Sequence, residues 1–299
     1  MITEPQQLAQ PAAWTITPEC PENWHELLPV CHAGFFHSPS GLLAGSPEGG
    51  PLYCVHSGKD GVDAVALGVR HACRLSRQAR HVYFPSAPAL RISTSGLAIV
   101  RDLVATLRDL GVADVTMGSF DATWCPAGPT AAFETRREEF VISLTGTSDE
   151  IFARCSAHRR REIRKADKTG MAVRTHTGVE ARRALDLVQE SARERAKNRG
   201  APFAGPPMKA FANEQIGSDS PWGATAFGAW DGDTLLSAAL VGWAGRRAYN
   251  VAGGGTPAGY QSHAGAWLHW QITTALASAG FVTYNLGGAA SDKNGQSGL

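Results

Sequence analysis

The chain has 299 residues, which is enough for one large domain or for two ordinary ones with their own apolar cores. Its hydrophobic content of 43%, charged content of 18% and formal net charge of +1 are typical of a soluble globular protein and exclude a strong overall attraction to nucleic acid or anionic lipid. No apolar stretch reaches the length of a membrane span, so we expect no membrane insertion, and the N-terminus does not resemble a secretion signal. The six cysteines form no CxxC pair, so we expect a reducing, cytoplasmic environment and no metal site.

The first half is predicted to consist mainly of strands. Residues 1–20 look irregular, and residues 21–37 mix helical spacing with helix breakers. An amphipathic helix is predicted over 93–110, because apolar residues recur on one face until Gly111 ends it. Residues 121–134, rich in Pro, Ala and Thr, are expected to form a linker or exposed loop. The strands are predicted at 52–56, 62–69, 81–84 and 112–117.

The second half alternates strands and helices. Ser148 and Asp149 are expected to open a helix that continues through a basic stretch to Gly170. The glycine run 253–255 is expected to form a loop. Further helices are predicted at 179–198, 208–216 and 263–279, and strands at 139–144, 171–175, 224–230, 234–243, 246–252 and 281–286.

Each half therefore reads as strands with helices on their faces, which gives an α/β or α+β fold class. Hairpins and crossover connections occur together, so mixed sheets are predicted. We place the domains at 1–135 and 136–299.

The strongest concentration of charge lies between His158 and Lys168. On a helix, the basic residues form a stripe at i, i+3 and i, i+4 spacing that suits a phosphate, a diphosphate or an RNA backbone. On charge alone, a solvated helix face is the more common explanation of such a run. The stripe consists of Arg160, Arg161, Arg164, Lys165 and Lys168.

Two strand ends are further candidates for a ligand site. Asn250 leads through Val251 and Ala252 into Gly253, Gly254 and Gly255, where a ligand can approach the main chain closely, although a flexible loop explains the same run. Tyr284 and Asn285 precede Gly287 at the end of a strand, which is where ligands bind in open sheets. The chain has no G-x-S-x-G motif, no dinucleotide fingerprint and no zincin arrangement.

The order and spacing of these segments resemble one known group. Residues 161–173 resemble the R-x-I-R-K-A-x-x-x-G-hydrophobic-x-V signature of Fem-type aminoacyltransferases, part of the wider FemAB and GNAT acyltransferase group. Residues 268–280 resemble the L-x-W-x-x-I-x-x-A-x-x-x-G helix of that family, and residues 284–288 its Y-D/N-hydrophobic-G-G strand end. In the first half, residues 36–39 resemble its F-x-S-P segment, which contains His37 here.

The resemblance implies two GNAT-like domains in tandem with the acceptor bound in a cleft between them. It implies transfer of an aminoacyl group from aminoacyl-tRNA, or of an acyl group from acyl-CoA in more distant members, to an amine. Such transfer needs a neutral amine and a stabilised oxyanion rather than a dedicated nucleophile. No bound cofactor is implied. The chain shows no clear Q/R-x-x-G-x-G/A loop for coenzyme A, so aminoacyl-tRNA is the favoured donor.

Two departures from the family bear on the acceptor. Bridge-forming members continue past the paired glycines into a G-L-x-x-F-K-x-x-F-G segment, where this chain reads Gln296-Ser297-Gly298-Leu299. The first half also holds a single lysine, Lys59, to meet the phosphates of a cell-wall precursor. We therefore expect a small amine or peptide-like acceptor, such as an intermediate of a specialised metabolite or antibiotic. A non-catalytic RNA- or ligand-binding module of the same fold is the alternative from a different functional class.

The candidate site residues follow from these motifs. Asn250, Tyr284 and Asn285 are predicted to orient the acceptor or the carbonyl, and Asp121 is a candidate general base. The predicted substrate-binding residues are Arg161, Arg164, Lys165, Gly253, Gly254, Gly255, Trp243 and His37.

Overall fold

A computed structural model describes residues 13–39, 50–72, 80–91, 95–122, 124, 132–134, 137–198, 200 and 219–290. The chain divides into two compact units, residues 1–37 with 48–131 and residues 38–47 with 132–299. The predicted boundary between residues 135 and 136, the predicted helix at 208–216 and the C-terminal residues 296–299 lie outside the described residues.

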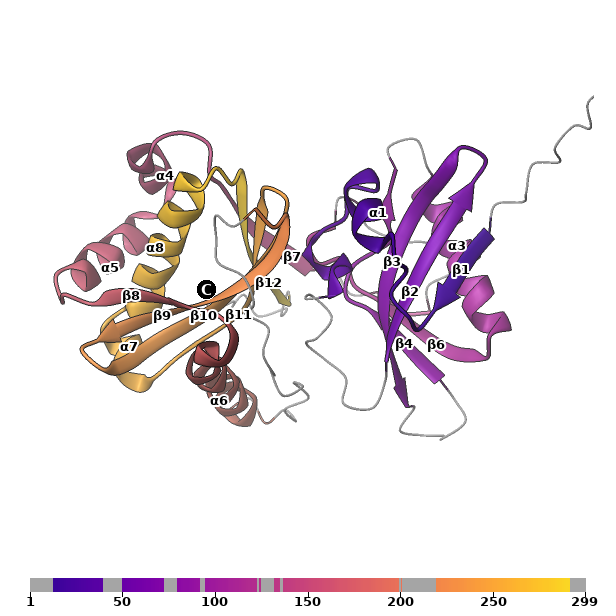
Figure 1. Ribbon diagram of the computed structural model, residues 1–299. Helices are drawn as coiled ribbons and strands as arrows, with labels where there is room; N and C mark the ends of the chain where they lie inside the picture. The colour runs from indigo at the N-terminus through magenta and orange to yellow at the C-terminus, as the bar shows by residue number, and fades with distance from the viewer. Residues whose placement is uncertain are drawn as a thin grey trace, which may run out of the picture. The chain divides into compact units, whose positions relative to one another are not determined.

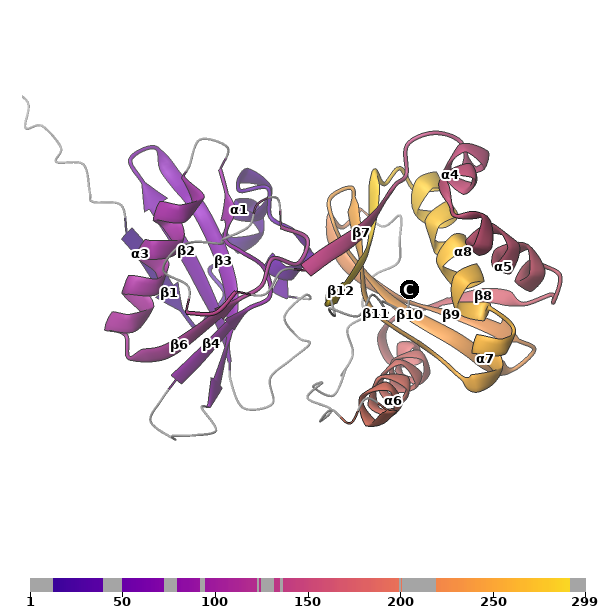
Figure 2. The ribbon, with the colours of Figure 1, turned by 180° about the vertical axis from the view of Figure 1, so that it is seen from behind.

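The first unit is built on a six-stranded sheet in the order β1-β2-β3-β4-β6, with β5 paired to β3 (Figures 1 and 2). Neighbouring strands are antiparallel except β4 and β6, which are parallel across the α3 crossover. The strands are β1 (Ala13–Thr17), β2 (Pro51–Gly58), β3 (Gly61–Ala72), β4 (Arg80–Phe84), β5 (Ala89–Leu90) and β6 (Val112–Met117). The helices are α1 (Trp24–Val30), η1 (Phe35–His37) and α3 (Gly96–Asp109).

Helices pack on both faces of this sheet. Ile99, Leu103 and Leu107 of α3 belong to the core cluster on one face, together with Cys54 of β2. Tyr53, the preceding residue in β2, points to the opposite face and meets the Trp24 ring of α1 edge-on. The helix predicted at 93–110 is therefore confirmed. The prediction that residues 1–20 are irregular is wrong for 13–17, which pair with β2 as an edge strand.

The second unit contains a mixed six-stranded sheet in the order β7-β12-β11-β10-β9-β8, in which only β11 and β12 are parallel. Its strands are β7 (Arg137–Ser143), β8 (Ala172–His176), β9 (Trp222–Asp231), β10 (Thr234–Ala244), β11 (Arg247–Gly255) and β12 (Thr283–Ala290). Its helices are α4 (Ser148–Arg154), α5 (Ala157–Asp167), η2 (Gly178–Ala181), α6 (Arg182–Asn198), α7 (Pro257–Gln261) and α8 (Ala264–Ser278).

Helices cover the two faces of the second sheet differently. Helix α6 lies on one face, and α8, with α5 packed beside it, lies on the other (Figures 1 and 2). Strand β10 is buried along nearly its whole length because it lies between these layers. The predicted α/β class with mixed sheets is confirmed.

The single helix predicted from Ser148 to Gly170 is wrong, because two helices occupy this segment. Thr147, rather than Ser148, caps α4 in a reciprocal capping box with Glu150. Cys155 is extended, and the Ser156 side chain then accepts a hydrogen bond from the Arg159 N–H to begin α5. The basic stripe therefore lies on α5 and on Lys168, the residue that ends this helix.

The loop predicted at the glycine run is also wrong, because Gly253, Gly254 and Gly255 belong to β11 and pair with β10. A Cβ on Gly254 would lie 2.8 Å from the Ser191 Cβ and 3.0 Å from the Val188 Cα, both in α6. This glycine therefore lets α6 pack directly on the strand.

Candidate active site at the divergence of β11 and β12

The parallel ladder between β11 and β12 stops early. It pairs Arg247 with Thr283, Ala248 with Tyr284 and Tyr249 with Asn285, although β11 continues to Gly255. Beyond Asn285, β12 has a register shift and follows β7. Where paired strands separate, their main-chain groups become available to an extended ligand. The divergence lies beside all three predicted catalytic residues.

Half-buried His269 of α8 and buried Tyr284 of β12 form a hydrogen-bonded pair. The Tyr284 hydroxyl lies 3.0 Å from Nδ1 of His269, and Tyr284 is fully buried. Burial, assisted by the positive charge of Arg159, lowers the pKa of His269 to about 4, and burial raises the pKa of Tyr284 above its ordinary value. The imidazole and the phenol are therefore both neutral near pH 7.

Asn250 lies on the same face of the sheet. It is paired with Val241, whose side chain belongs to the core beneath α8, and paired residues point to the same face. The Asn250 Oδ1 is buried and has no hydrogen-bond partner among the described residues. A buried acceptor without a donor favours a ligand N–H group at this position.

Asn285 points to the other face, where its side chain is held at both ends. Its Nδ2 donates to Oε2 of Glu139 at 2.8 Å, and its Oδ1 accepts from the Gly287 N–H at 2.8 Å. Oε1 of Glu139 accepts from the Tyr249 hydroxyl at 3.1 Å. The structure thus links Asn285 to β7 and to the bend of β12, an arrangement that fixes where the strands separate.

Main-chain groups of the glycine run are engaged by α6. Arg195 donates to the Gly253 carbonyl oxygen at 3.1 Å, and the Gly255 N–H donates to the Ser191 hydroxyl at 3.4 Å. The Tyr260 hydroxyl lies 3.1 Å from that of Ser191. This part of β11 is therefore not an open cradle for a phosphate.

The basic stripe divides into structural and exposed residues. Arg160 donates to the carbonyl oxygens of Ala153 and Cys155, so it closes the break between α4 and α5. The Arg164 guanidinium lies 5.3 Å from the centre of the Phe152 ring. Arg164 is itself exposed, and so are Arg161, Lys165 and Lys168; none of these four forms an ion pair with a described residue.

Trp243 is a core residue. It is buried, donates from Nε1 to the Ser220 carbonyl oxygen at 3.3 Å and packs edge-on against Phe281. The structure therefore gives Trp243 a packing role beneath α8.

His37 lies in the first unit. Its Nδ1 accepts from the Gly34 N–H at 3.2 Å, and its Nε2 lies 2.9 Å from the Ala87 carbonyl oxygen. It lines a small pocket with His32 and Asp121, both of which have positive φ. His37 and Asp121, predicted for the substrate and the general base, thus line one pocket of this unit.

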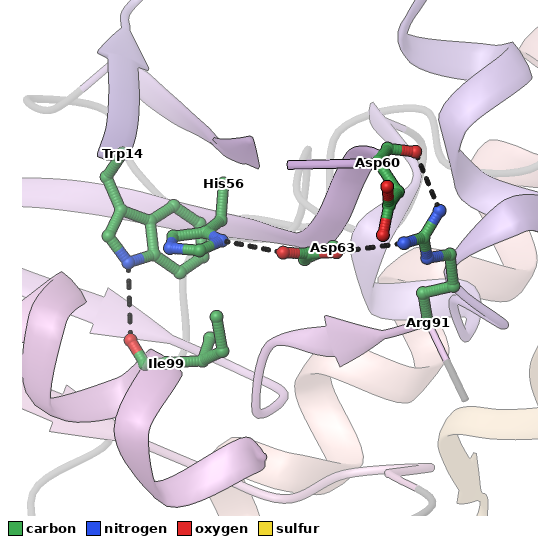
Figure 3. Close-up of polar contacts among 6 residues, drawn as sticks. All are labelled: Trp14, His56, Asp60, Asp63, Arg91 and Ile99. Atoms are coloured by element: carbon green, nitrogen blue, oxygen red, sulfur yellow. Dashed lines mark hydrogen bonds and ion pairs between the residues drawn. The ribbon is translucent and has the colours of Figure 1, made fainter. Parts of the chain in front are cut away.

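Another polar cluster of the first unit is structural. Asp63 lies 3.8 Å from Nδ1 of buried His56 and 3.3 Å from the Arg91 guanidinium, and the Trp14 indole covers the imidazole ring edge-on (Figure 3). Trp14 also donates to the Ile99 carbonyl oxygen at 3.2 Å, which joins β1 to α3. The cluster therefore links three strands and a helix.

The part of the chain that the structure describes contains no group of three or more His, Cys, Asp or Glu side chains placed to hold a metal ion. None of the helices in the same ranges is long and apolar enough to cross a membrane.

His269 and Glu139 are functional candidates that the sequence motifs did not identify. His269 occupies a variable position of the helix motif, and 15 positions separate it from Tyr284. Glu139 lies 146 positions from Asn285, so no local pattern connects them. Only the folded sheet brings these pairs together.

Comparison with known proteins agrees with this arrangement. Residues 153–293 match the family model described as an acetyltransferase (GNAT) domain. The crystal structure of FemX is similar with a TM-score of 0.55 and 13% identity, over 83% of this chain and 82% of that chain. The structure of L-PGS from Bacillus licheniformis is similar with a TM-score of 0.52 and 14% identity, over 94% of this chain and 79% of that chain.

No curated protein matches the sequence. The identities of the structural neighbours are low, so their likeness concerns the fold. Together with the domain match, they confirm the resemblance stated from the sequence motifs at the level of the fold: residues 153–293 match a GNAT domain, and the chain has a Fem-like GNAT fold.

Proposed function

We propose that the protein transfers an aminoacyl group from aminoacyl-tRNA to an amine and forms an amide bond. The observation that carries this proposal is the divergence of β11 from β12, where neutral His269, the Tyr284 hydroxyl and the unpartnered Asn250 Oδ1 lie on one face. A GNAT domain in this region supports acyl transfer as the reaction class.

The residues suit attack by an amine on an activated carbonyl. Asn250 Oδ1 accepts an N–H of the incoming amine and directs the nitrogen lone pair toward the acyl carbon. The main chain of β11 beyond Tyr249 positions the donor. Asn285 acts as a positioning residue, because its two hydrogen bonds hold the bend of β12.

The exposed cations of α5 favour a tRNA donor. Arg161, Lys165 and Lys168 present positive charge on an exposed helix face, and such a face suits a nucleic-acid backbone. Arg164 contributes charge while its guanidinium packs over Phe152.

Acyl-CoA is the second candidate donor, because the matching family model describes an acetyltransferase. One contact disfavours it. Oε1 of Glu162 lies 3.4 Å from Nδ1 of His263, the residue that begins α8, so a carboxylate already lies near a helix N-terminus that would otherwise attract a pyrophosphate.

The acceptor that we propose is a small amine or peptide-like molecule of specialised-metabolite or antibiotic biosynthesis, handled in the cytoplasm, where charged tRNA is available. The single lysine before residue 160 supports this choice, because a nucleotide-linked cell-wall precursor needs more basic contacts.

A donor screen tests the proposed function. The protein is incubated with charged tRNA pools or with acyl-CoAs of increasing length, each with a panel of amines, and amide products are detected by mass spectrometry. We expect products from charged tRNA that disappear after ribonuclease treatment of the pool. If products form only with acyl-CoA, then acyl-CoA and not aminoacyl-tRNA is the donor. Tight RNA binding without transfer from either donor would indicate a binding module instead.

A further inference from the structure

We infer that His269 is a catalytic residue that binds the acyl carbonyl oxygen of the donor through its Nε2–H and stabilises the oxyanion that forms during transfer. This inference rests on the proposed function and extends it to a residue outside the family motifs. It assigns His269 as a hydrogen-bond donor and excludes it as the base that deprotonates the amine.

The tautomer follows from the hydrogen bonds of Tyr284. The Tyr284 hydroxyl is fully buried, and Nδ1 of His269, at 3.0 Å, is its hydrogen-bond partner among the described residues. A buried hydroxyl donates its hydrogen wherever an acceptor is available, because a buried donor left without a hydrogen bond destabilises the folded chain. Tyr284 therefore donates to Nδ1, and the proton of the neutral ring lies on Nε2.

The charge state agrees with a donor role. The pKa of His269 is lowered to about 4, first by burial and then by the positive charge of Arg159. Arg159 itself pairs with Glu162 at 2.9 Å. His269 thus stays neutral near pH 7, and the positive potential of Arg159 favours negative charge rather than an ammonium group beside the ring.

The His269 ring lies between Gly253 of β11 and Tyr284 of β12, the two strands that separate. A Cβ built on Gly253 would lie 3.9 Å from Nε2, so the missing side chain of this glycine leaves room between the imidazole and β11. Tyr284 holds the other side of the ring from β12, one pair before the ladder ends. Gly253 lies on the face that carries Asn250, because its partner Ala239 belongs to the same core as Val241.

Transfer needs only the ester of the donor and the neutral amine as reactants. The nitrogen lone pair of the neutral amine forms a C–N bond with the acyl carbon, and the π pair of the carbonyl moves to oxygen, where Nε2–H binds it. The oxyanion then re-forms C=O and the ester C–O bond breaks. The leaving ribose oxygen takes the electron pair of that bond and the proton that the amine nitrogen loses, so an ester and an amine become an amide and an alcohol.

Three variants test this role in the full-length protein. Removal of one oxyanion donor lowers kcat by about 10²–10³-fold, so we expect this loss in His269→Ala with KM nearly unchanged. The amide N–H of His269→Gln replaces Nε2–H, so this variant should stay within about tenfold of wild type. His25→Gln changes an exposed histidine of α1 and serves as the control. A His269→Gln variant as inactive as His269→Ala, or a fully active His269→Ala, would overturn the assignment.

A measurement without substrate separates this inference from the proposed function. In ¹⁵N-histidine-labelled protein, the His269 signals, identified by their absence in His269→Gln, should show a protonated Nε2 and an unprotonated, hydrogen-bonded Nδ1 at pH 7. Tyr284→Phe should shift the Nδ1 signal, because its hydrogen-bond donor is gone. A protonated Nδ1 in wild type would refute the inference even if the protein transfers acyl groups. Absence of transfer from every donor, with the expected tautomer present, would refute the proposed function.

Discussion

Burial of His269 against Tyr284 gives this residue an effect on stability as well as a role in transfer. The folded chain keeps its pKa at about 4, below the ordinary value of 6.5. The unfolded chain therefore takes up a proton between pH 6.5 and pH 4 while the folded chain does not, and this uptake favours unfolding as the pH falls.

We predict that wild type loses stability relative to His269→Gln on acidification. The free energy of unfolding of wild type minus that of His269→Gln should be constant above pH 7. It should fall by at most about 3 kcal/mol between pH 7 and pH 4, since one pKa unit corresponds to about 1.4 kcal/mol. Urea unfolding of both proteins at several pH values measures it. Parallel pH profiles would show that the imidazole titrates normally in the folded chain.

Two neighbouring glycines offer a matched pair of substitutions. Gly254→Ala places a Cβ 2.8 Å from the Ser191 Cβ, so we expect overpacking against α6 to lower the free energy of unfolding by about 1–3 kcal/mol. Gly253→Ala finds its nearest neighbour at 3.6 Å and should fold with nearly unchanged stability, but its methyl group fills the space before His269 Nε2 and slows transfer about tenfold. Unfolding and steady-state assays measure both, and equal stability of the two variants would contradict the packing assigned to α6.

At the scale of elements, α5 separates charges that hold the fold from charges that remain for a partner. Arg161→Ala combined with Lys165→Ala removes two exposed cations, so we expect a higher KM for charged tRNA and an unchanged Tm. A plot of the logarithm of the tRNA binding constant against the logarithm of the salt concentration should become less steep by about 2. Arg101→Ala with Arg108→Ala, two exposed cations of α3, is the matched control.

Arg160→Ala should behave in the opposite way, with a lower Tm, because Arg160 donates to the carbonyl oxygens of Ala153 and Cys155. If the double α5 variant bound charged tRNA as tightly as wild type, the stripe would be an ordinary solvated surface.

The elements that the sequence predicted well are those with a local cause. Helix α3 follows from its apolar spacing and from Gly111, whose positive φ suits the end of a helix. The break after α4 was missed because no Gly or Pro interrupts residues 148–169, and only its bond to the Arg159 N–H identifies Ser156 as a cap. The glycine run was misassigned because its cause is a tertiary contact, the approach of α6 to Gly254.

At the scale of the whole molecule, each unit has its own apolar core and its own mixed sheet. The ordered motifs were sufficient to predict the fold, since those at 161–173, 268–280 and 284–288 fall in that order on α5 and β8, on α8 and on β12. They were insufficient for the site, because the pairs His269 with Tyr284 and Glu139 with Asn285 form only when distant segments come together.

We propose that acyl transfer takes place where β11 and β12 separate. A crystal structure with a non-hydrolysable donor analogue, a nucleotide carrying a 3′-amide-linked amino acid, tests it most directly. We predict that the acyl carbonyl oxygen lies about 3 Å from Nε2 of His269, with the aminoacyl group beside β11 beyond Tyr249. An analogue bound with its carbonyl away from His269, for example in the His37 and Asp121 pocket of the first unit, would contradict the account.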